Sequence, residues 1–169
     1  MTTNLYTFVD LYSRQLATLT HILNKGAAFA KEKGITESEM LGWRLIEDMQ
    51  PLSFQISVVV NFTRAWPARV AGLPLPAEIG SDRTLAQYLA AIEDAKAYLA
   101  TIKPDQFAGR DDVPLKVMLG TGMEPTLPAA QWLTVFATTN IYFHLSTAYG
   151  IMRAHGVPIG KIDLFAGGL

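Results

Sequence analysis

Four polar side chains stand where the apolar pattern of the sequence calls for core residues: Asp48, Gln55, Asn140 and His144. Asn140 and His144 are four residues apart, so a helix places both on one face. Gln55 follows Asp48 by seven residues, which is about two helical turns. A buried polar group costs roughly 1–3 kcal/mol unless it is hydrogen-bonded, so each of the four needs a partner. We predict that they converge between two neighbouring helices.

Two interpretations of this cluster are open. In the structural one, the side chains only satisfy one another, and Asp48 caps the next helix or pairs with Arg44. In the functional one, Asp48, Gln55, Asn140 and His144 bind a small ligand or a metal ion, as residues between facing helices of a bundle often do. His144 would then be able to act as a general base, because an unperturbed imidazole has a pKa of about 6.5. No catalytic residue and no metal ligand is assigned.

Known catalytic patterns are absent from the rest of the sequence. It contains no G-x-S-x-G elbow, no phosphate-binding glycine loop, no H-E-x-x-H motif and no cysteine. We expect His21 to lie in solvent and His155 to cap the end of a helix. The sequence therefore leaves open whether the protein is an enzyme.

Four long helices are expected to position these residues. Apolar residues recur in steps of three and four over Thr3–Lys33, from Pro51 to the loop at Gly72, from Thr84 to Ile102 and over Ala129–Ala154. Capping boxes start a short connecting helix within 35–46 (Thr36 with Glu39) and the third long helix (Thr84 with Gln87). The periodicity fails between Pro104 and Pro128, where 113–119 and 123–127, joined by Gly120-Thr-Gly122, predict a small β-hairpin.

The last long helix carries apolar residues on two faces. One face has Leu133, Phe136, Ala137, Ala148 and Ile151, and the other has Val135, Tyr142, Leu145, Tyr149 and Met152. Both faces must be covered. Either other helices of the same subunit cover the second face, or a second subunit does so together with Phe54 and Val58. We predict a homodimer on this basis.

The composition limits the class of protein. The chain has 169 residues, of which 50% are hydrophobic and 17% charged, with a net charge of −1. Its length suits one domain over residues 1–169, and the absence of a cationic cluster argues against a nucleic-acid partner. Neither a signal peptide nor a membrane span is evident, so we expect a cytoplasmic protein that does not associate with membranes.

Four sequence blocks, in order, resemble an uncharacterised bacterial family of the DinB/YfiT-like superfamily. They are Asp48-Met-Gln-Pro-Leu52 with Gln55, Ala68-Arg-Val-Ala-Gly72, Asn140-Ile-Tyr-Phe-His144 with Ala148-Tyr149, and His155-Gly-Val-Pro-Ile-Gly-Lys161. The resemblance implies an all-α fold, namely an up-down-down-up four-helix bundle that is commonly dimeric.

The same resemblance raises the question of a metal. Many members of that superfamily hold a divalent metal with a histidine on the second helix and an H-x-x-x-H pair on the fourth, and some are hydrolases or thiol-dependent transferases. Here His144 matches the first histidine of the pair, but Ala148 and Gln55 occupy the other two positions. Because an amide is a weak ligand for zinc or nickel, we predict no cofactor. A divalent metal held by His144 with Asp48 or a water is the alternative.

Three functions are compatible with these observations. The main hypothesis is a dimeric bundle that binds a small molecule at its polar cluster. The alternatives are a metal-dependent hydrolase or transferase and a noncatalytic interaction protein.

Overall fold

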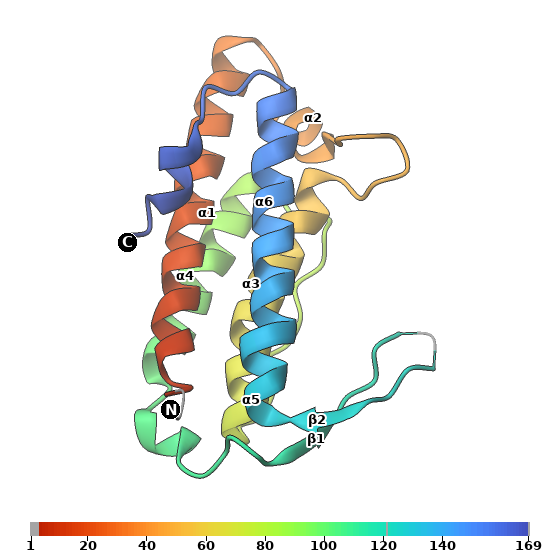
Figure 1. The fold of residues 1–169 in the computed structure, drawn as a ribbon. Helices are drawn as coiled ribbons and strands as arrows, with labels where there is room; N and C mark the ends of the chain where they lie inside the picture. The colour runs from red at the N-terminus through yellow and green to blue at the C-terminus, as the bar shows by residue number, and fades with distance from the viewer. Residues whose placement is uncertain (1–3, 121, 169) are drawn as a thin grey trace.

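Four long helices form a bundle in the computed structural model, which describes residues 4–120 and 122–168. They are α1 (Thr7–Glu32), α3 (Leu52–Ala71), α4 (Leu85–Thr101) and α6 (Thr138–Ala154). The chain runs up α1, down α3, down α4 and up α6 (Figure 1). The all-α, up-down-down-up prediction is thus confirmed, while the predicted helix start at Thr3 and the turn residue Thr121 lie outside the described residues.

The helices begin and end where local chemistry predicts. α1 buries Tyr12, Leu16 and Leu19 at helical spacing, and the chain leaves it through Gly34 at a φ of 69°. Both predicted capping boxes are present, at α2 (Glu37–Gly42) and at α4. α2 is shorter than the predicted 35–46 because the backbone is already extended at Trp43, whose ring stacks on that of His155. His155 caps the end of α6, as expected.

A π-helical turn interrupts the last long helix. The segment predicted as one helix consists of α5 (Ala129–Gln131), a π-helical stretch labelled η2 (Trp132–Ala137) and α6. The carbonyl oxygen of Leu133 accepts hydrogen bonds from Thr138 Oγ1 at 2.9 Å and from Tyr12 Oη at 3.0 Å. Burial raises the pKa of Tyr12 far above its ordinary value, so its hydroxyl remains a donor. These bonds tie α1 to the wide turn.

The predicted β-hairpin is present and is bonded to η2. β1 (Pro114–Lys116) pairs antiparallel with β2 (Thr126–Pro128), with Leu115 opposite Leu127. The indole of Trp132 donates to the carbonyl oxygen of Leu115 at 2.8 Å. The short helix η1 (Pro104–Phe107) connects α4 to this hairpin.

The segment after α6 folds back along α1. Its short helix η3 (Lys161–Phe165) follows α1 in the direction of the N-terminus (Figure 1). The carboxylate of Asp163 accepts hydrogen bonds from the backbone N–H of Gly160 and from Lys25 Nζ, the latter at 2.9 Å. It also pairs with His21 Nε2 at 2.6 Å. Together these bonds hold the pKa of Asp163 far below its ordinary value, and the bond from Gly160 has the largest effect. The expectation that His21 is merely solvated is therefore wrong.

The bundle itself covers much of the second apolar face of the last helix. Leu145 and Met152 are buried in the core, whereas Val135 is 57% exposed and Tyr142 is 44% exposed. Phe143, outside both predicted faces, is 57% exposed. The apolar surface left uncovered on this helix is therefore smaller than predicted and consists of Val135, Tyr142 and Phe143.

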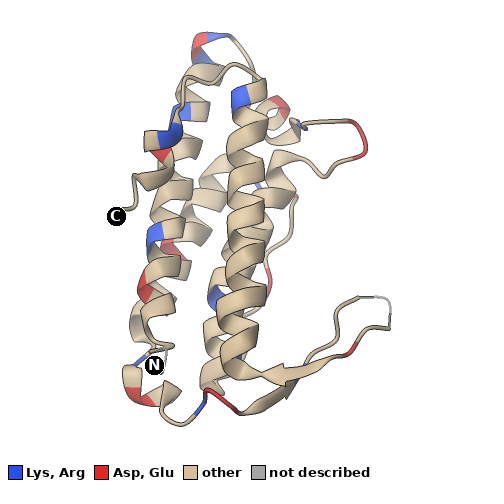
Figure 2. Ribbon diagram, viewed as in Figure 1, with Lys and Arg blue, Asp and Glu red and all other residues tan. Residues whose placement is uncertain are grey.

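Charged residues lie mainly in loops and near helix ends, leaving the middle of α3 and α6 nearly uncharged (Figure 2). Arg153 is the one lysine, arginine, aspartate or glutamate in α6. Among the described residues, no helix combines the length and apolarity that crossing a membrane requires.

The hydroxyl of Tyr12 provides a test of how α1 is tied to η2. Tyr12→Phe removes the hydroxyl that bonds to the carbonyl oxygen of Leu133 and to Thr138 Oγ1. The hydroxyl has a single proton to donate, so we expect a loss of about 1 kcal/mol in the free energy of unfolding and a Tm lower by roughly 2–4 °C. Tyr149→Phe is the control, because the Tyr149 hydroxyl bonds to none of the described residues. Equal thermal shifts for both variants would contradict this role of Tyr12.

Candidate functional site

A hydrogen bond between α3 and α6 brings two of the predicted site residues together. His144 Nδ1 lies 2.7 Å from Gln55 Oε1. The other end of the same amide, Gln55 Nε2, donates to the carbonyl oxygen of Gln50 at 3.0 Å. Since Gln55 Oε1 can only accept, Nδ1 of the neutral ring carries the proton and Nε2 is an unprotonated acceptor. The amide of Gln55 thereby sets the tautomer of His144.

His144 is half-buried between aromatic rings. Phe54 meets it edge-on at 6.0 Å between ring centroids, and Phe143 is perpendicular to it at 5.1 Å. Burial lowers the pKa of His144 below its ordinary value, because the protonated ring is poorly solvated there. The imidazole is therefore neutral at pH 7, and it presents Nε2 as a hydrogen-bond acceptor and a weak base.

Asn140 lies one turn before His144 on α6 and is partly exposed. Its Nδ2 donates to the carbonyl oxygen of Phe136 in its own helix at 2.7 Å. This bond leaves Oδ1 as an acceptor, on the helix face that Asn140 shares with His144. Asn140 adds an acceptor near the pair without bonding to Gln55 or His144.

Asp48 does not join the other three. It is exposed in the turn between α2 and α3, and among the described residues it has no hydrogen bond or ion pair. The spacing of seven residues failed as a predictor because α3 begins at Leu52, and two residues share a helix face only when both lie in the helix. Arg44, its alternative partner, donates instead to the carbonyl oxygen of Met49. The prediction that all four side chains converge is wrong for Asp48.

These donors do not fit a transition metal. Ala148 is fully buried and has no donor atom, and the Nδ1 of His144 is bonded to the amide of Gln55. One imidazole with one neutral amide is a weak set for zinc or nickel. Within 4–120 and 122–168, no group of three or more His, Asp or Glu side chains is arranged to hold a metal ion.

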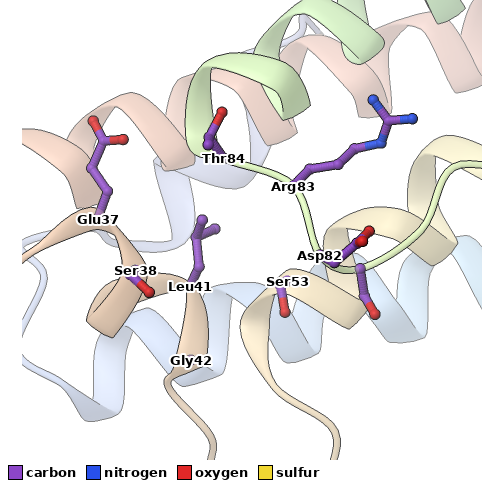
Figure 3. Close-up of a pocket in the computed structure, with 9 residues that line it drawn as sticks. Glu37, Ser38, Leu41, Gly42, Ser53, Asp82, Arg83 and Thr84 are labelled. Atoms are coloured by element: carbon purple, nitrogen blue, oxygen red, sulfur yellow. The ribbon is translucent and has the colours of Figure 1, made fainter.

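Two hollows of the surface do not include the Gln55–His144 pair in their linings. One, of about 520 Å³, is lined by α2, the start of α3 and the segment before α4 (Figure 3). Another, of about 450 Å³, lies between α3, residues 78–81 and residues 117–119, and Phe54 is on its wall. Neither has Gln55 or His144 in its lining: Gln55 is buried, and His144 is half-buried beside Phe54.

Sequence reasoning overlooked a second inter-helix pair. Gln15 of α1 is buried, and its Nε2 donates to Tyr142 Oη of α6 at 2.9 Å. A signal for it was present: Gln15 follows Tyr12 by three residues and precedes Leu19 by four, which places it on the buried stripe of α1. Tyr142 gave no such signal, because a tyrosine on an apolar face is typical of an ordinary packing residue.

Comparison with known proteins identifies the family. The model of the family described as "Domain of unknown function (DUF1993)" matches residues 5–165. A crystal structure of a DinB family member protein from Shewanella denitrificans is similar at 28% sequence identity with a TM-score of 0.85, covering 99% of this chain and 97% of that one. No curated protein matches.

These findings confirm the resemblance to an uncharacterised DinB-like family, which the four sequence blocks carried. The family model spans nearly the whole bundle, from α1 to η3. The chain therefore belongs to the DUF1993 family of domains of unknown function, and its fold is that of a DinB family member.

Proposed function

We propose that this protein binds a small neutral molecule at the Gln55–His144 pair. The observation that carries the proposal is the hydrogen bond of 2.7 Å between Gln55 Oε1 and His144 Nδ1. It fixes the tautomer that leaves Nε2 with a lone pair, and Nε2 bonds to none of the described residues.

The surroundings of His144 indicate the chemistry of the ligand. His144 Nε2 and Asn140 Oδ1 are two acceptors one turn apart, so the ligand should carry hydroxyl or N–H donors. Phe54 and the exposed Phe143 offer ring surfaces to its apolar part. No cationic side chain belongs to this set, so an anionic ligand is disfavoured.

No reaction is assigned to this site. A neutral imidazole could remove a proton from a bound hydroxyl. Catalysis would also need a group that stabilises developing charge, and Gln55 is already bonded to Gln50 and His144. A binding function is therefore better supported than a metal-dependent hydrolase or transferase activity, because the donor atoms at this site do not fit a transition metal. The cytoplasm remains the compartment that the sequence predicts.

We also propose that the protein forms a homodimer through α6, in which a second copy covers the uncovered apolar surface. Val135 and Phe143 are each 57% exposed, and Tyr142 lies between them in sequence. Exposed large apolar side chains so close together favour a protein interface. In such a dimer, the second copy would lie beside the Gln55–His144 pair and would help to exclude water from it.

Titration of His144 tests the first step of the argument. We expect its NMR midpoint below 6.5, the ordinary value, because burial disfavours the charged ring. The unfolded chain then takes up the proton first, so the free energy of unfolding contributed by this group falls as the pH drops from 6.5 through the lowered pKa. Gln55→Leu should leave the ring in a mixture of tautomers by ¹⁵N shifts. A midpoint at or above 6.5 would contradict the proposed neutral acceptor.

Ligand binding is tested by incubating the purified protein with a metabolite extract, isolating it by gel filtration and identifying retained compounds by mass spectrometry. We expect at least one retained compound. Its affinity, measured by calorimetry, should fall about 3- to 10-fold in His144→Ala, because one hydrogen bond is lost.

Lys96→Ala, on the exposed face of α4, is the matched control and should bind as the wild type does. Retention of nothing by the wild type, or equal affinity in His144→Ala, would overturn the site. Elemental analysis of the same samples separates the alternative: a stoichiometric transition metal that disappears in His144→Ala would favour the metalloenzyme.

The dimer is tested by sedimentation velocity at micromolar concentration. We expect the wild type to sediment as a dimer and Val135→Glu/Phe143→Glu as a folded monomer, because buried unpaired carboxylates are costly. Ile162→Glu, at a position that is 85% exposed in η3, is the control and should remain dimeric. A monomeric wild type would refute the proposed assembly.

A further inference from the structure

A third cavity, of about 400 Å³, lies between α1, α6 and the C-terminal segment. Figure 1 shows that segment beside α1 and near α6. Leu145, Leu164 and Phe165 form apolar walls, while Gln15, Tyr142 and Ser146 supply uncharged polar groups. Two charged residues, Arg14 and Lys161, also line the cavity. Its volume falls in the usual range for small-molecule sites. The cavity does not include Gln55 or His144, so a ligand bound in it would be separate from the one proposed at that pair. Tyr142, however, both lines the cavity and belongs to the surface proposed for the dimer.

Gln15, which lines this cavity, has a buried acceptor that is not used within the described residues. The side chain is only 8% exposed, and its Nε2 donates to Tyr142 Oη at 2.9 Å. Its Oε1 is buried and has no hydrogen-bond partner among the described residues. Leaving a buried acceptor unpaired costs free energy that a bound donor would recover. Gln55, the comparable buried amide in α3, has partners for both of its ends.

The outer wall of the cavity is held in place. Asp163 binds Lys25 and His21 of α1 as well as the N–H of Gly160. Further along, the N–H of Gly167 donates to Thr18 Oγ1 at 3.1 Å. The segment carrying Leu164 and Phe165 is therefore fastened to α1 on both sides of these residues, so the cavity has a defined shape.

We propose that this cavity is a binding site for a small, largely apolar molecule with one N–H or O–H group, which donates to Gln15 Oε1. The apolar body packs against Leu145, Leu164 and Phe165, and the donor group completes the hydrogen bonding of the amide. Tyr142 keeps the amide oriented through its bond to Nε2.

Indole and benzofuran are suitable probes, because they have nearly the same shape and only indole has an N–H donor. Each is titrated into ¹⁵N-labelled protein, and binding is followed in two-dimensional NMR spectra. We expect indole to shift the side-chain amide signals of Gln15 and the backbone signals of Ser146 and Phe165. Benzofuran should shift the same backbone signals but bind about 3- to 10-fold more weakly.

Two variants separate the hydrogen bond from the cavity. Gln15→Leu replaces a buried amide whose oxygen is unpaired by an apolar group of similar size, so it should fold and bind both probes equally. Ser146→Trp fills the cavity from an exposed position of α6 and should weaken both probes more than tenfold. Thr139→Trp, also exposed on α6 but outside the cavity lining, is the matched control and should bind as the wild type does.

Several results would overturn the proposal. One is the absence of shifts at millimolar indole, which would mean that the amide is satisfied by water alone. Others are shifts centred on Trp66 in the hollow beside α3, or equal or stronger binding of benzofuran by the wild type. Unchanged binding in Ser146→Trp would equally exclude this cavity as the site.

Discussion

The packing of α6 against α3 is the contact on which the rest of the structure depends. Both helices are almost free of charge along their middle, and Ile56 and Val59 of α3 and Ile141 and Ala148 of α6 are completely buried. Burial on this scale leaves few places for polar groups, and those that remain need a hydrogen-bond partner, either in their own helix, as for Thr63 and Thr147, or across the interface. Gln55 and His144 meet across this interface. The tautomer of His144 results from its bond to Gln55, and its lowered pKa results from burial.

Much of the fold could be predicted because it obeys local rules. Apolar spacing located the four long helices, and the capping boxes at Thr36 and Thr84 marked two helix starts to the residue. The hairpin was recognisable from the loss of helical periodicity before Pro128. Each of these signals lies within a short stretch of sequence, so no knowledge of the tertiary contacts was needed.

Features that depend on distant parts of the chain could not be predicted in the same way. The partnership of Asp163 with His21 joins residues 142 positions apart, and neither has a local pattern that points to the other. The bond from Tyr12 to Leu133 spans 121 positions and supports a π-helical turn that the apolar pattern does not reveal. Asp48 shows the reverse failure: the helix start had been predicted at Pro51, next to the observed Leu52, but a spacing rule that holds only within a helix was extended to a residue before that start.

The π-helical turn in η2 also determines how α6 is rotated about its own axis. An α-helix turns by about 100° per residue, and a π-helical turn accommodates one residue more than an α-helical turn does. Without that extra residue, α6 would be rotated by roughly 100° about its axis, and His144 would no longer point toward Gln55. The number of residues between Trp132 and Ala137 therefore determines which side chains of α6 face α3. Substitutions that preserve the π-helical turn would leave the same positions of α6 facing α3.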